Sequence, residues 1–485
     1  MAIFIYFLST SELIGLNLAF SSLTLLLIIY LAFEINQVRH LQPERWLINP
    51  IVLCSLMTFV LAFGVSNIIY FLPQNAIKFF NLTPEITPEM NKLMFLVVVG
   101  ALAMWFGYWS PIAGRLSVLG PMIKFRDRIF IFDSEPKAWV LPALVLISFI
   151  SRVVSIQLGI YGYSSNYEQL IAAASYSQYL ALAGSLGKLA LVLSALKYYS
   201  PQKNLRVKIW FLGILISEVT FGFMGGFKSA VIMPFIIIFL VKYIKTDRVP
   251  RNLLIAIPIV LIIAYAVIEP FRSIKNLADK YQGGYQSTSV LNIGSTVFQA
   301  VKFAYSGADT REKSTFIVGI MARSNLTSNG SKGIEFADIN KNLPEGSPQF
   351  LNGILLAPVY AWVPRFLWEG KPIWDTGLWY TQTVMGYGHD SSTAMGLFTY
   401  LYFAGGLIAV FASLFCLGVF YRIFFFFTRP WMSNAGATVF LGMTSSICMI
   451  AEGAFNGVMV SIFRELPILI IIVALMFARI KFTFR

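Results

Sequence analysis

Residues 395–420 read MGLFTYLYFAGGLIAVFASLFCLGVF and contain no Asp, Glu, Lys, Arg or His. An α-helix rises about 1.5 Å per residue, so roughly 20 consecutive apolar residues cross the ~30 Å hydrocarbon core of a bilayer. This run meets both requirements, length and apolar character. We therefore predict a membrane-spanning helix here, and the same criterion applies to the rest of the chain.

Similar apolar runs recur along almost the whole sequence of 485 residues, which is 57% apolar and only 12% charged. Soluble domains carry about 25% charged residues. The sequence thus predicts an all-α, polytopic integral membrane protein with about eleven spanning helices. The expected spans are 13–33, 50–72, 92–111, 138–160, 176–197, 209–224, 229–243, 252–270, 395–420, 434–455 and 458–478.

Lys and Arg residues are concentrated in alternate connections, chiefly 112–137, 197–208 and 242–251. Connections rich in these residues stay in the cytoplasm. The short loops on the other side hold only Lys78, Lys92 and Lys228. This asymmetry predicts an N-terminus outside, in the periplasm, and a C-terminus in the cytoplasm.

One long connection, residues 271–394, lies on the outer side by this topology. Such loops are uncommon in compact domains and are often functional. Its middle, 295–326, has helical periodicity, whereas its end, 350–368, is apolar but too short to cross twice. We expect that end to dip into the outer leaflet or to lie along it. The chain then divides into helices one to eight (1–270), the loop (271–394) and helices nine to eleven (395–485).

Few charges lie inside the predicted spans, because each costs about 2.5–3.5 kcal/mol near the bilayer centre. They are Arg152, Lys188, Glu218, Glu452, Arg464 and Glu465, with Lys228, Glu269 and Arg272 at helix ends. Nearly all fall in the outer half of the membrane, and only Lys188 lies near mid-span. Two interpretations stay open. Either Arg152 pairs with Glu218, and Arg464 with Glu452 or Glu465, or the cations line a polar cavity that opens outward beneath the long loop.

Cations beside apolar walls suit an anionic head group on a lipid tail, since the planar fork of Arg matches phosphate oxygens. The loop stretch WVPRFLWEGKPIWD, residues 362–375, sets further cations among tryptophans. Aromatic rings can stack on the apolar C–H faces of sugars. The residues concerned are Arg365, Lys371, Trp362, Trp368 and Trp374. Together these features predict a site for a phosphate-linked, lipid-tailed saccharide.

Other classes of function lack their motifs. The chain has no G-x-x-x-x-G-K-[ST] phosphate loop, and its two histidines, His40 and His389, fall on opposite sides of the membrane. The net charge of +14 is dispersed over loops, so it indicates topology and not nucleic-acid binding. We expect no metal and no cofactor. Because ATP and nucleotide sugars are lacking outside the cell, an outward-facing enzyme needs a preactivated donor such as a lipid diphosphate sugar.

The stretch GYGHDSST, residues 386–393, precedes the ninth predicted span. A histidine there has the chemistry of a general base near neutral pH. The alternative is a solvated loop histidine at a helix start, where Asp390, Ser391 or Ser392 serves as the N-cap. His389 and Asp390 are therefore candidate catalytic residues, with Glu452 held in reserve.

A family resemblance rests on RSNL at 323–326, VPRFLWEGKP at 363–372 and the helix at 391–422. Together they resemble the bacterial oligosaccharide repeat unit polymerases, the Wzy type of O-antigen and exopolysaccharide polymerase. In that family a Pro-Arg, an aromatic and a Lys-Pro recur before a helix with a small-residue pattern, here Gly396, Tyr400, Phe403 and Gly405. Many relatives have Trp-Pro where this chain has Trp368-Glu369.

The resemblance implies a GT-C-like, metal-independent, inverting glycosyltransferase at the outer face of the bacterial cytoplasmic membrane. It would polymerise undecaprenyl-diphosphate-linked oligosaccharide repeat units into O-antigen or exopolysaccharide. Arg365 and Lys371 match the family's cationic motif, Arg323 its upstream arginine, and Arg272 matches more weakly by position. With Arg152 and Arg464 these would hold the diphosphate, while Trp362, Trp368 and Trp374 would stack on sugars.

Membrane lipid is a further expected partner, and a chain-length regulator and a flippase are candidate protein partners. Two other functions compete with the polymerase. An O-antigen ligase shares the architecture, and a flippase or other transporter of lipid-linked oligosaccharide would also bind the same ligand. A transporter should show two matching halves with broken helices, and no such symmetry is visible in the sequence.

Overall fold

The computed structural model describes residues 1–72, 85–119, 124, 126–127, 136–162, 169, 172–173, 175–201, 204–281, 290–305, 321–322, 324–363, 367–368, 371, 376–387 and 392–477. Within this part of the chain, all regular secondary structure is helical. Ten helices in it are long and apolar enough to cross a membrane. The chain is a polytopic, multi-pass membrane protein, as predicted.

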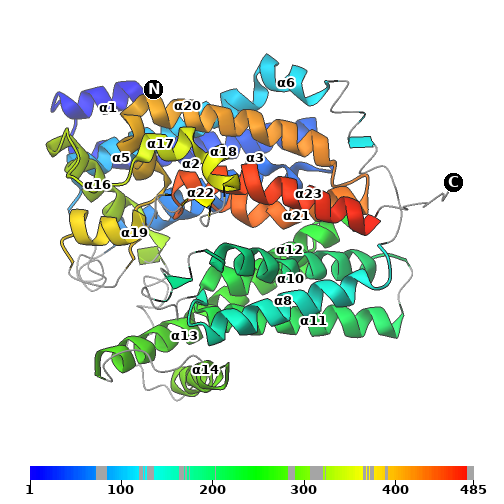
Figure 1. Cartoon of the computed structure of the whole chain (residues 1–485). Helices are drawn as coiled ribbons and strands as arrows, with labels where there is room; N and C mark the ends of the chain where they lie inside the picture. The colour runs from blue at the N-terminus through cyan, green and yellow to red at the C-terminus, as the bar shows by residue number, and fades with distance from the viewer. Residues whose placement is uncertain are drawn as a thin grey trace.

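The first group of helices occupies the upper part of Figure 1. The group is made of α2 (Leu16–Leu41), α3 (Pro50–Cys54) with η2 (Ser55–Val65) and η3 (Ser66–Phe71), α5 (Pro88–Trp109), α20 (Leu397–Thr428), α21 (Asn434–Cys448), and α22 (Phe455–Val460) with η7 (Ser461–Glu465) and α23 (Leu466–Phe477). The helix α1 (Ala2–Thr10), the turn η1 (Trp46–Ile48) and the short helix α6 (Pro111–Ser117) pack beside it.

The second group lies below it in Figure 1. It is made of α8 (Val140–Gln157), α10 (Ser177–Tyr198), α11 (Leu205–Gly225), α12 (Lys228–Thr246), α13 (Arg251–Tyr281) and α14 (Val290–Tyr305). Each of α10, α11, α12 and α13 packs against its neighbour in the sequence, as short connections require. The two groups meet where α10 and α12 pack against α21.

Small residues let α5 and α20 pack closely in the first group. A Cβ on Gly107 would lie 2.0 Å from the carbonyl oxygen of Phe415, and one on Gly418 would lie 1.9 Å from that of Met104. Gly100 is as tightly covered, by Leu414. Membrane helices associate through such close backbone approach, since lipid offers no hydrophobic drive between them. These glycines therefore fix the centre of the first group.

The structure differs from the prediction at 434–455, where only the 15-residue helix α21 forms, capped at its start by the Ser433 side chain. Its last carbonyls find partners on neighbouring helices. Tyr421 donates to the carbonyl of Ile447, and Thr58 donates to that of Cys448 at 2.8 Å. Because the final carbonyls of a helix need such partners, the chain leaves the helix here and runs irregularly until α22.

The described parts of the long loop after α14 form short helices that pack on the first group. They are α16 (Thr327–Ile339), α17 (Phe350–Leu355), α18 (Ala357–Trp362), α19 (Thr376–Trp379) and η6 (Tyr380–Val384). The side chain of Asn67 accepts hydrogen bonds from Asn325 at 2.9 Å and Thr327 at 2.7 Å. Phe350 stacks on Phe403, with ring centroids 4.9 Å apart. The helical periodicity expected within 295–326 appears in α14, and the apolar end of the loop becomes α17 and α18.

The small-residue pattern of α20 has a structural role. Its backbone leaves the helical conformation at Gly405 and Gly406, and Gly406 has φ of 61°, a left-handed conformation that glycine adopts without strain. Gly396 precedes the helix with φ of 82°. Tyr400 donates to the carbonyl of Phe350 at 3.2 Å. The pattern therefore shapes the helix start and attaches the loop to it.

Candidate functional site

Helix α10 separates two clusters of charged side chains. Residues of a helix are spaced about 100° apart around its axis, so Gly184 and Gly187 lie on the face opposite to Gln178, Ser185 and Leu189. The glycine face packs against α8 and its charged cluster. The other face lines a cavity shared with α21, η7 and α23. The two clusters differ in how far their charges are satisfied.

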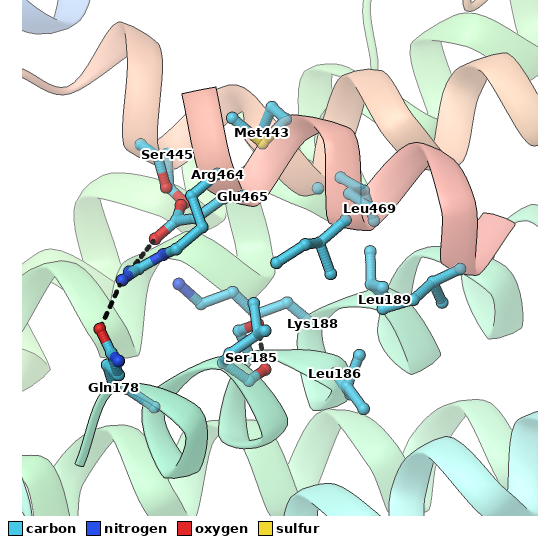
Figure 2. Close-up of a pocket in the computed structure, with 16 residues that line it drawn as sticks. Gln178, Ser185, Leu186, Lys188, Leu189, Met443, Ser445, Arg464, Glu465 and Leu469 are labelled. Carbon is cyan, nitrogen blue, oxygen red and sulfur yellow. Dashed lines mark hydrogen bonds and ion pairs between the residues drawn. The ribbon is translucent and has the colours of Figure 1, made fainter. Parts of the chain in front are cut away.

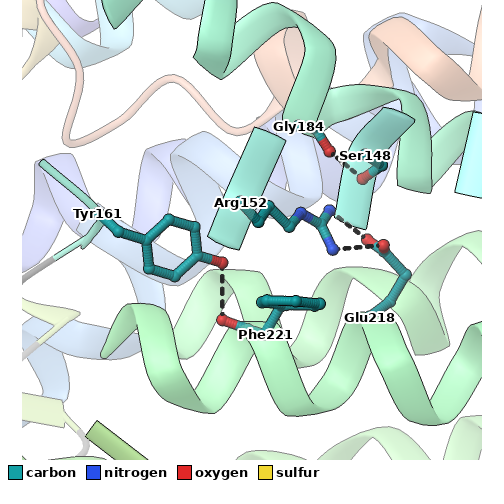
Figure 3. Close-up of polar contacts among 6 residues, drawn as sticks. All are labelled: Ser148, Arg152, Tyr161, Gly184, Glu218 and Phe221. Carbon is teal, nitrogen blue, oxygen red and sulfur yellow. Dashed lines mark hydrogen bonds and ion pairs between the residues drawn. The ribbon is translucent and has the colours of Figure 1, made fainter. Parts of the chain in front are cut away.

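The first cluster is a closed ion pair between Arg152 of α8 and Glu218 of α11 (Figure 3). Arg152 donates from Nη1 and Nη2 to the two carboxylate oxygens, at 2.6 and 2.9 Å. Its guanidinium also lies 5.0 Å from the ring centroid of Phe221. Both charged side chains are buried. A bidentate Arg–carboxylate pair of this kind is the arrangement that makes two buried charges tolerable.

Small and polar neighbours make room for this pair. A Cβ on Gly187 would lie 2.1 Å from a carboxylate oxygen of Glu218, so no larger residue fits there without movement. The hydroxyl of Ser148 donates a hydrogen bond to the carbonyl of Gly184 at 2.8 Å. Tyr161 donates to the carbonyl of Phe221 at 3.0 Å, and burial raises the pKa of Tyr161 to about 12, which keeps it a neutral donor.

The second cluster lines a cavity of about 180 Å³ between α10, α21, η7 and α23 (Figure 2). Its charged and polar lining residues are Gln178, Ser185, Lys188, Ser445, Ser446, Arg464 and Glu465. Its apolar lining residues include Leu182, Leu186, Leu189, Ile468, Leu469 and Ile472. The cavity lies where the two helical groups meet, and concave sites at such boundaries are the common places for ligands.

A π-helical turn puts two consecutive charged residues on this cavity. The turn is η7, Ser461–Glu465, inside the last spanning helix. The wider turn of a π-helix re-aims side chains, and such turns are frequent at functional sites. Arg464 donates from Nη1 to the side-chain oxygen of Gln178 at 3.0 Å. Its Nη2 lies 4.0 Å from Glu465, at the limit of an ion pair. Arg464 thus keeps donors available to a ligand.

Lys188 is the second cation of the cavity. It forms no ion pair within the part of the chain that the structure describes. The nearby carboxylate of Glu218 already has both oxygens on Arg152. In Figure 2 the ammonium of Lys188 points toward the side where Arg464 meets Gln178. An unpaired lysine inside a membrane span is costly, so it indicates a ligand.

The lining of the cavity mixes polar and apolar side chains along the helices. Gln178 lies in the first turn of α10, at the end that the predicted topology puts outside, whereas Lys188 and Leu189 lie near the middle of that helix. Arg464 and Glu465 lie near the middle of the last spanning helix, one turn before Leu469. Such a site suits an amphiphile with an anionic head and an apolar tail. The described residues contain no group of three or more His, Cys, Asp or Glu that could hold a metal ion.

The predicted diphosphate ligands are distributed over several places. Arg464 lines the cavity, whereas Arg152 forms an ion pair with Glu218. This ion pair is the first of the two interpretations that the sequence left open for Arg152. Arg272 donates from Nε to the carbonyl of Gly226 at 3.0 Å, at the C-terminal end of α11. Arg323 and Arg365 lie outside the described residues. Only Arg464 among the described arginines of the prediction meets the cavity.

The motif around Lys371 is described in part. Lys371 donates from its ammonium to the carbonyl of Val363 at 2.9 Å. Trp368 stacks on Tyr360, with centroids 5.5 Å apart, and Trp362 is exposed. Trp374 lies outside the described residues. The helix before the motif, α18, packs against α22 and η7. The motif therefore follows an element that touches the arginine-bearing turn.

Among the predicted catalytic residues, His389 and Asp390 lie outside the described part of the chain, and Glu452 is exposed in the connection between α21 and α22. Arg464 has Glu465, not Glu452, as its carboxylate neighbour. The predicted ligands and catalytic residues did not include Lys188, Gln178 and Glu465, although Lys188 and Glu465 were among the charges identified within the spans. A signal was present, since Gln178, Ser185 and Lys188 recur at helical spacing in an otherwise apolar span.

A scan of known protein-family models and searches of curated proteins and of solved structures found no match to this chain. The geometry of the cavity is therefore the main basis for assigning a function.

Proposed function

We propose that this chain is a membrane glycosyltransferase that polymerises undecaprenyl-diphosphate-linked oligosaccharide repeat units. The observation that carries the proposal is the cavity that Lys188 and Arg464 share, with apolar walls beside its cations. A diphosphate has the charge to match two cations, and its isoprenoid chain matches the leucine and isoleucine walls. The family resemblance at 323–422 supports the same chemistry.

Binding of the diphosphate is favourable because both cations act in a poorly solvated place. Charges attract more strongly at low dielectric than in water. Arg464 offers a planar fork that can bind two phosphate oxygens, and Lys188 adds a mobile point charge. Folding has already removed water from around Lys188, so the ligand does not add this desolvation cost. An anionic ligand then gains the full attraction of both side chains.

The proposed reaction forms one glycosidic bond and breaks another. A hydroxyl oxygen of the acceptor repeat unit attacks the anomeric carbon of the donor glycan on the face opposite to the diphosphate. The bond from that carbon to the phosphate oxygen breaks, and its electron pair stays on the undecaprenyl diphosphate. Arg464 and Lys188 stabilise the negative charge that develops there, as preorganised cations do in transition states. The acceptor proton passes to a base.

The long loop supports an outward-facing site for this reaction. Its helices α16, α17 and α18 pack on the ends of the first group, and α18 touches η7. The predicted topology puts this loop and the polar end of the cavity on the same, outer side. Lys371 follows α18, so it is within the part of the loop best placed to approach a substrate head group. Trp362 is exposed beside it and available to a sugar face.

Reconstitution tests the proposal. Deleting the gene for this chain should cause lipid-linked single repeat units to accumulate in its host, and these serve as both donor and acceptor. The purified protein in liposomes should convert them into a ladder of longer glycans, whereas Arg464→Gln should not. Single units that cross the bilayer without growing would replace the polymerase with a flippase. Transfer only to lipid A core would indicate a ligase.

A further inference from the structure

Glu465 is the one carboxylate that lines the cavity of Lys188 and Arg464 among the described residues. It lies directly after Arg464 in the π-helical turn η7. Its side chain keeps 33% of its surface accessible, so it is open to a molecule in the cavity. The diphosphate site described above needs cations only. A carboxylate beside it therefore requires its own explanation.

The contact between Glu465 and Arg464 is too long to occupy the carboxylate. The distance from Arg464 Nη2 to Glu465 Oε1 is 4.0 Å, beyond hydrogen-bond range. Arg464 is held instead by Gln178, through Nη1 at 3.0 Å. The pair of Arg152 and Glu218 is different, since both carboxylate oxygens there accept at 2.6 and 2.9 Å. Glu465 thus has free acceptor oxygens next to a cation that a ligand can take over.

We propose that Glu465 is the general base that deprotonates the acceptor hydroxyl. The inference rests on the proposed function, which supplies the donor and the acceptor. When the diphosphate binds Arg464, it adds negative charge beside the carboxylate of Glu465. A like charge nearby disfavours the ionised form of a carboxylate and so makes it a better proton acceptor. Binding of the donor therefore activates the base that the next step requires.

The transfer step is balanced with this residue as the base. The acceptor O–H bond breaks as its oxygen bonds to the anomeric carbon, and the proton moves to an Oε of Glu465. The carbon–oxygen bond to the diphosphate breaks, and the electron pair leaves with the undecaprenyl diphosphate. Departure of that product removes its negative charge from beside Glu465. The carboxylate then releases its proton to water and regains the starting state.

Other described carboxylates fit this role less well. Glu218 has both oxygens on Arg152 and is buried behind α10. Glu452 is exposed in the connection before α22 and does not line the cavity. A general base must lie within hydrogen-bond reach of the proton it takes. Among these three, Glu465 alone shares the cavity with the cations.

The test separates binding from turnover. Glu465→Gln keeps the size of the side chain and removes its ability to accept a proton. Undecaprenyl diphosphate should bind this variant as tightly as wild type or more tightly, because the variant removes a negative charge from beside the diphosphate site. With the accumulated lipid-linked repeat units, kcat should fall by roughly 100-fold or more, which is the usual share of a general base. Glu465→Asp should keep part of the turnover.

Chemical rescue distinguishes a base from a structural residue. In Glu465→Ala, added formate should restore part of kcat, because the small anion can occupy the vacated space and take the proton. Glu345→Gln, an exposed carboxylate in the long loop, is the matched control and should polymerise as wild type does. Wild-type kcat in Glu465→Gln would overturn the inference, and so would absent rescue in a correctly folded Glu465→Ala. If wild type itself makes no polymer, the proposed function fails first.

Discussion

The two faces of α10 treat charge in opposite ways. On one face Arg152 and Glu218 are buried together and satisfy one another through two hydrogen bonds. On the cavity side Lys188, which lies between the two faces, has no ion pair among the described residues, and Arg464 is held by a neutral amide. Both faces belong to one apolar helix and differ in their direction around its axis. The paired face has the features of a structural element, and the unpaired face those of a binding site.

The difference shows how a membrane protein distributes the cost of buried charge. A closed pair needs no ligand, but removal of either partner leaves an uncompensated charge. In an open pair of cations, the desolvation cost of the uncompensated charge is already present without a ligand. An anion that binds there gains electrostatic attraction, and the site does not have to be desolvated again. Variants at the ion pair should therefore lower stability more than ligand binding. Variants at the cavity should lower ligand binding more than stability.

Glu218→Ala should have the largest effect, on stability. Loss of the carboxylate leaves the Arg152 guanidinium buried and unpaired, which costs about 3–5 kcal/mol in proteins. We expect a strongly lowered thermal unfolding midpoint in detergent, measured by intrinsic fluorescence. Glu345→Ala, at an exposed loop carboxylate, should leave the midpoint unchanged. An unaltered midpoint in Glu218→Ala would mean that the pair is not structural.

Gly187→Ala should destabilise the protein by about 1–3 kcal/mol, as overpacking does in a tight core. The added Cβ would lie 2.1 Å from Glu218 and 2.7 Å from Ser148, so α10 would have to move away from the pair. Gly213→Ala on α11 is the matched control, since its Cβ would meet nothing within 4 Å. That control should be neutral or slightly stabilising, because alanine favours helix. Equal midpoints for the two variants would contradict the close packing at Gly187.

Lys188→Met should weaken binding of undecaprenyl diphosphate about tenfold, which corresponds to ~1.4 kcal/mol. The methionine keeps an apolar side chain of similar length but removes the charge that faces the cavity. Binding is measured by titration of the lipid into protein held in nanodiscs. Lys208→Met, in the first turn of α11 and outside the cavity, is the control. Unchanged affinity in Lys188→Met would separate this lysine from the diphosphate site.

The double variant Arg152→Met with Glu218→Leu should have the smallest effect, within about 1 kcal/mol of wild type or slightly more stable. Replacing a whole buried ion pair by apolar groups of similar volume is often neutral or stabilising, unlike breaking it. The unfolding midpoint again provides the measurement. Polymer formation should also persist, because the pair does not line the cavity. Loss of polymer in a stable double variant would assign the pair a role in function.

Much of the framework followed from local sequence. Apolar runs predicted all ten of the spanning helices found among the described residues, and one further span at 434–455, because length and hydrophobicity alone decide whether a segment can cross a bilayer. The pairing of Arg152 with Glu218 was one of two interpretations that the sequence left open, and the structure decides for it. The prediction failed to anticipate the early end of α21. Hydropathy carries no information about the hydrogen bonds that Tyr421 and Thr58 donate to the last carbonyls of this helix.

The sequence by itself determined that this is an all-helical, multi-pass membrane protein, and it identified the few charges that need partners. Only the tertiary structure decided which of those charges are satisfied. Arg464 is far along the chain from Gln178 and Lys188 of α10, and a π-helical turn together with the packing of α10 on α21 brings the three residues to one cavity. The physical reason is that pairing and cavities depend on distances between helices, whereas membrane insertion depends on each helix alone.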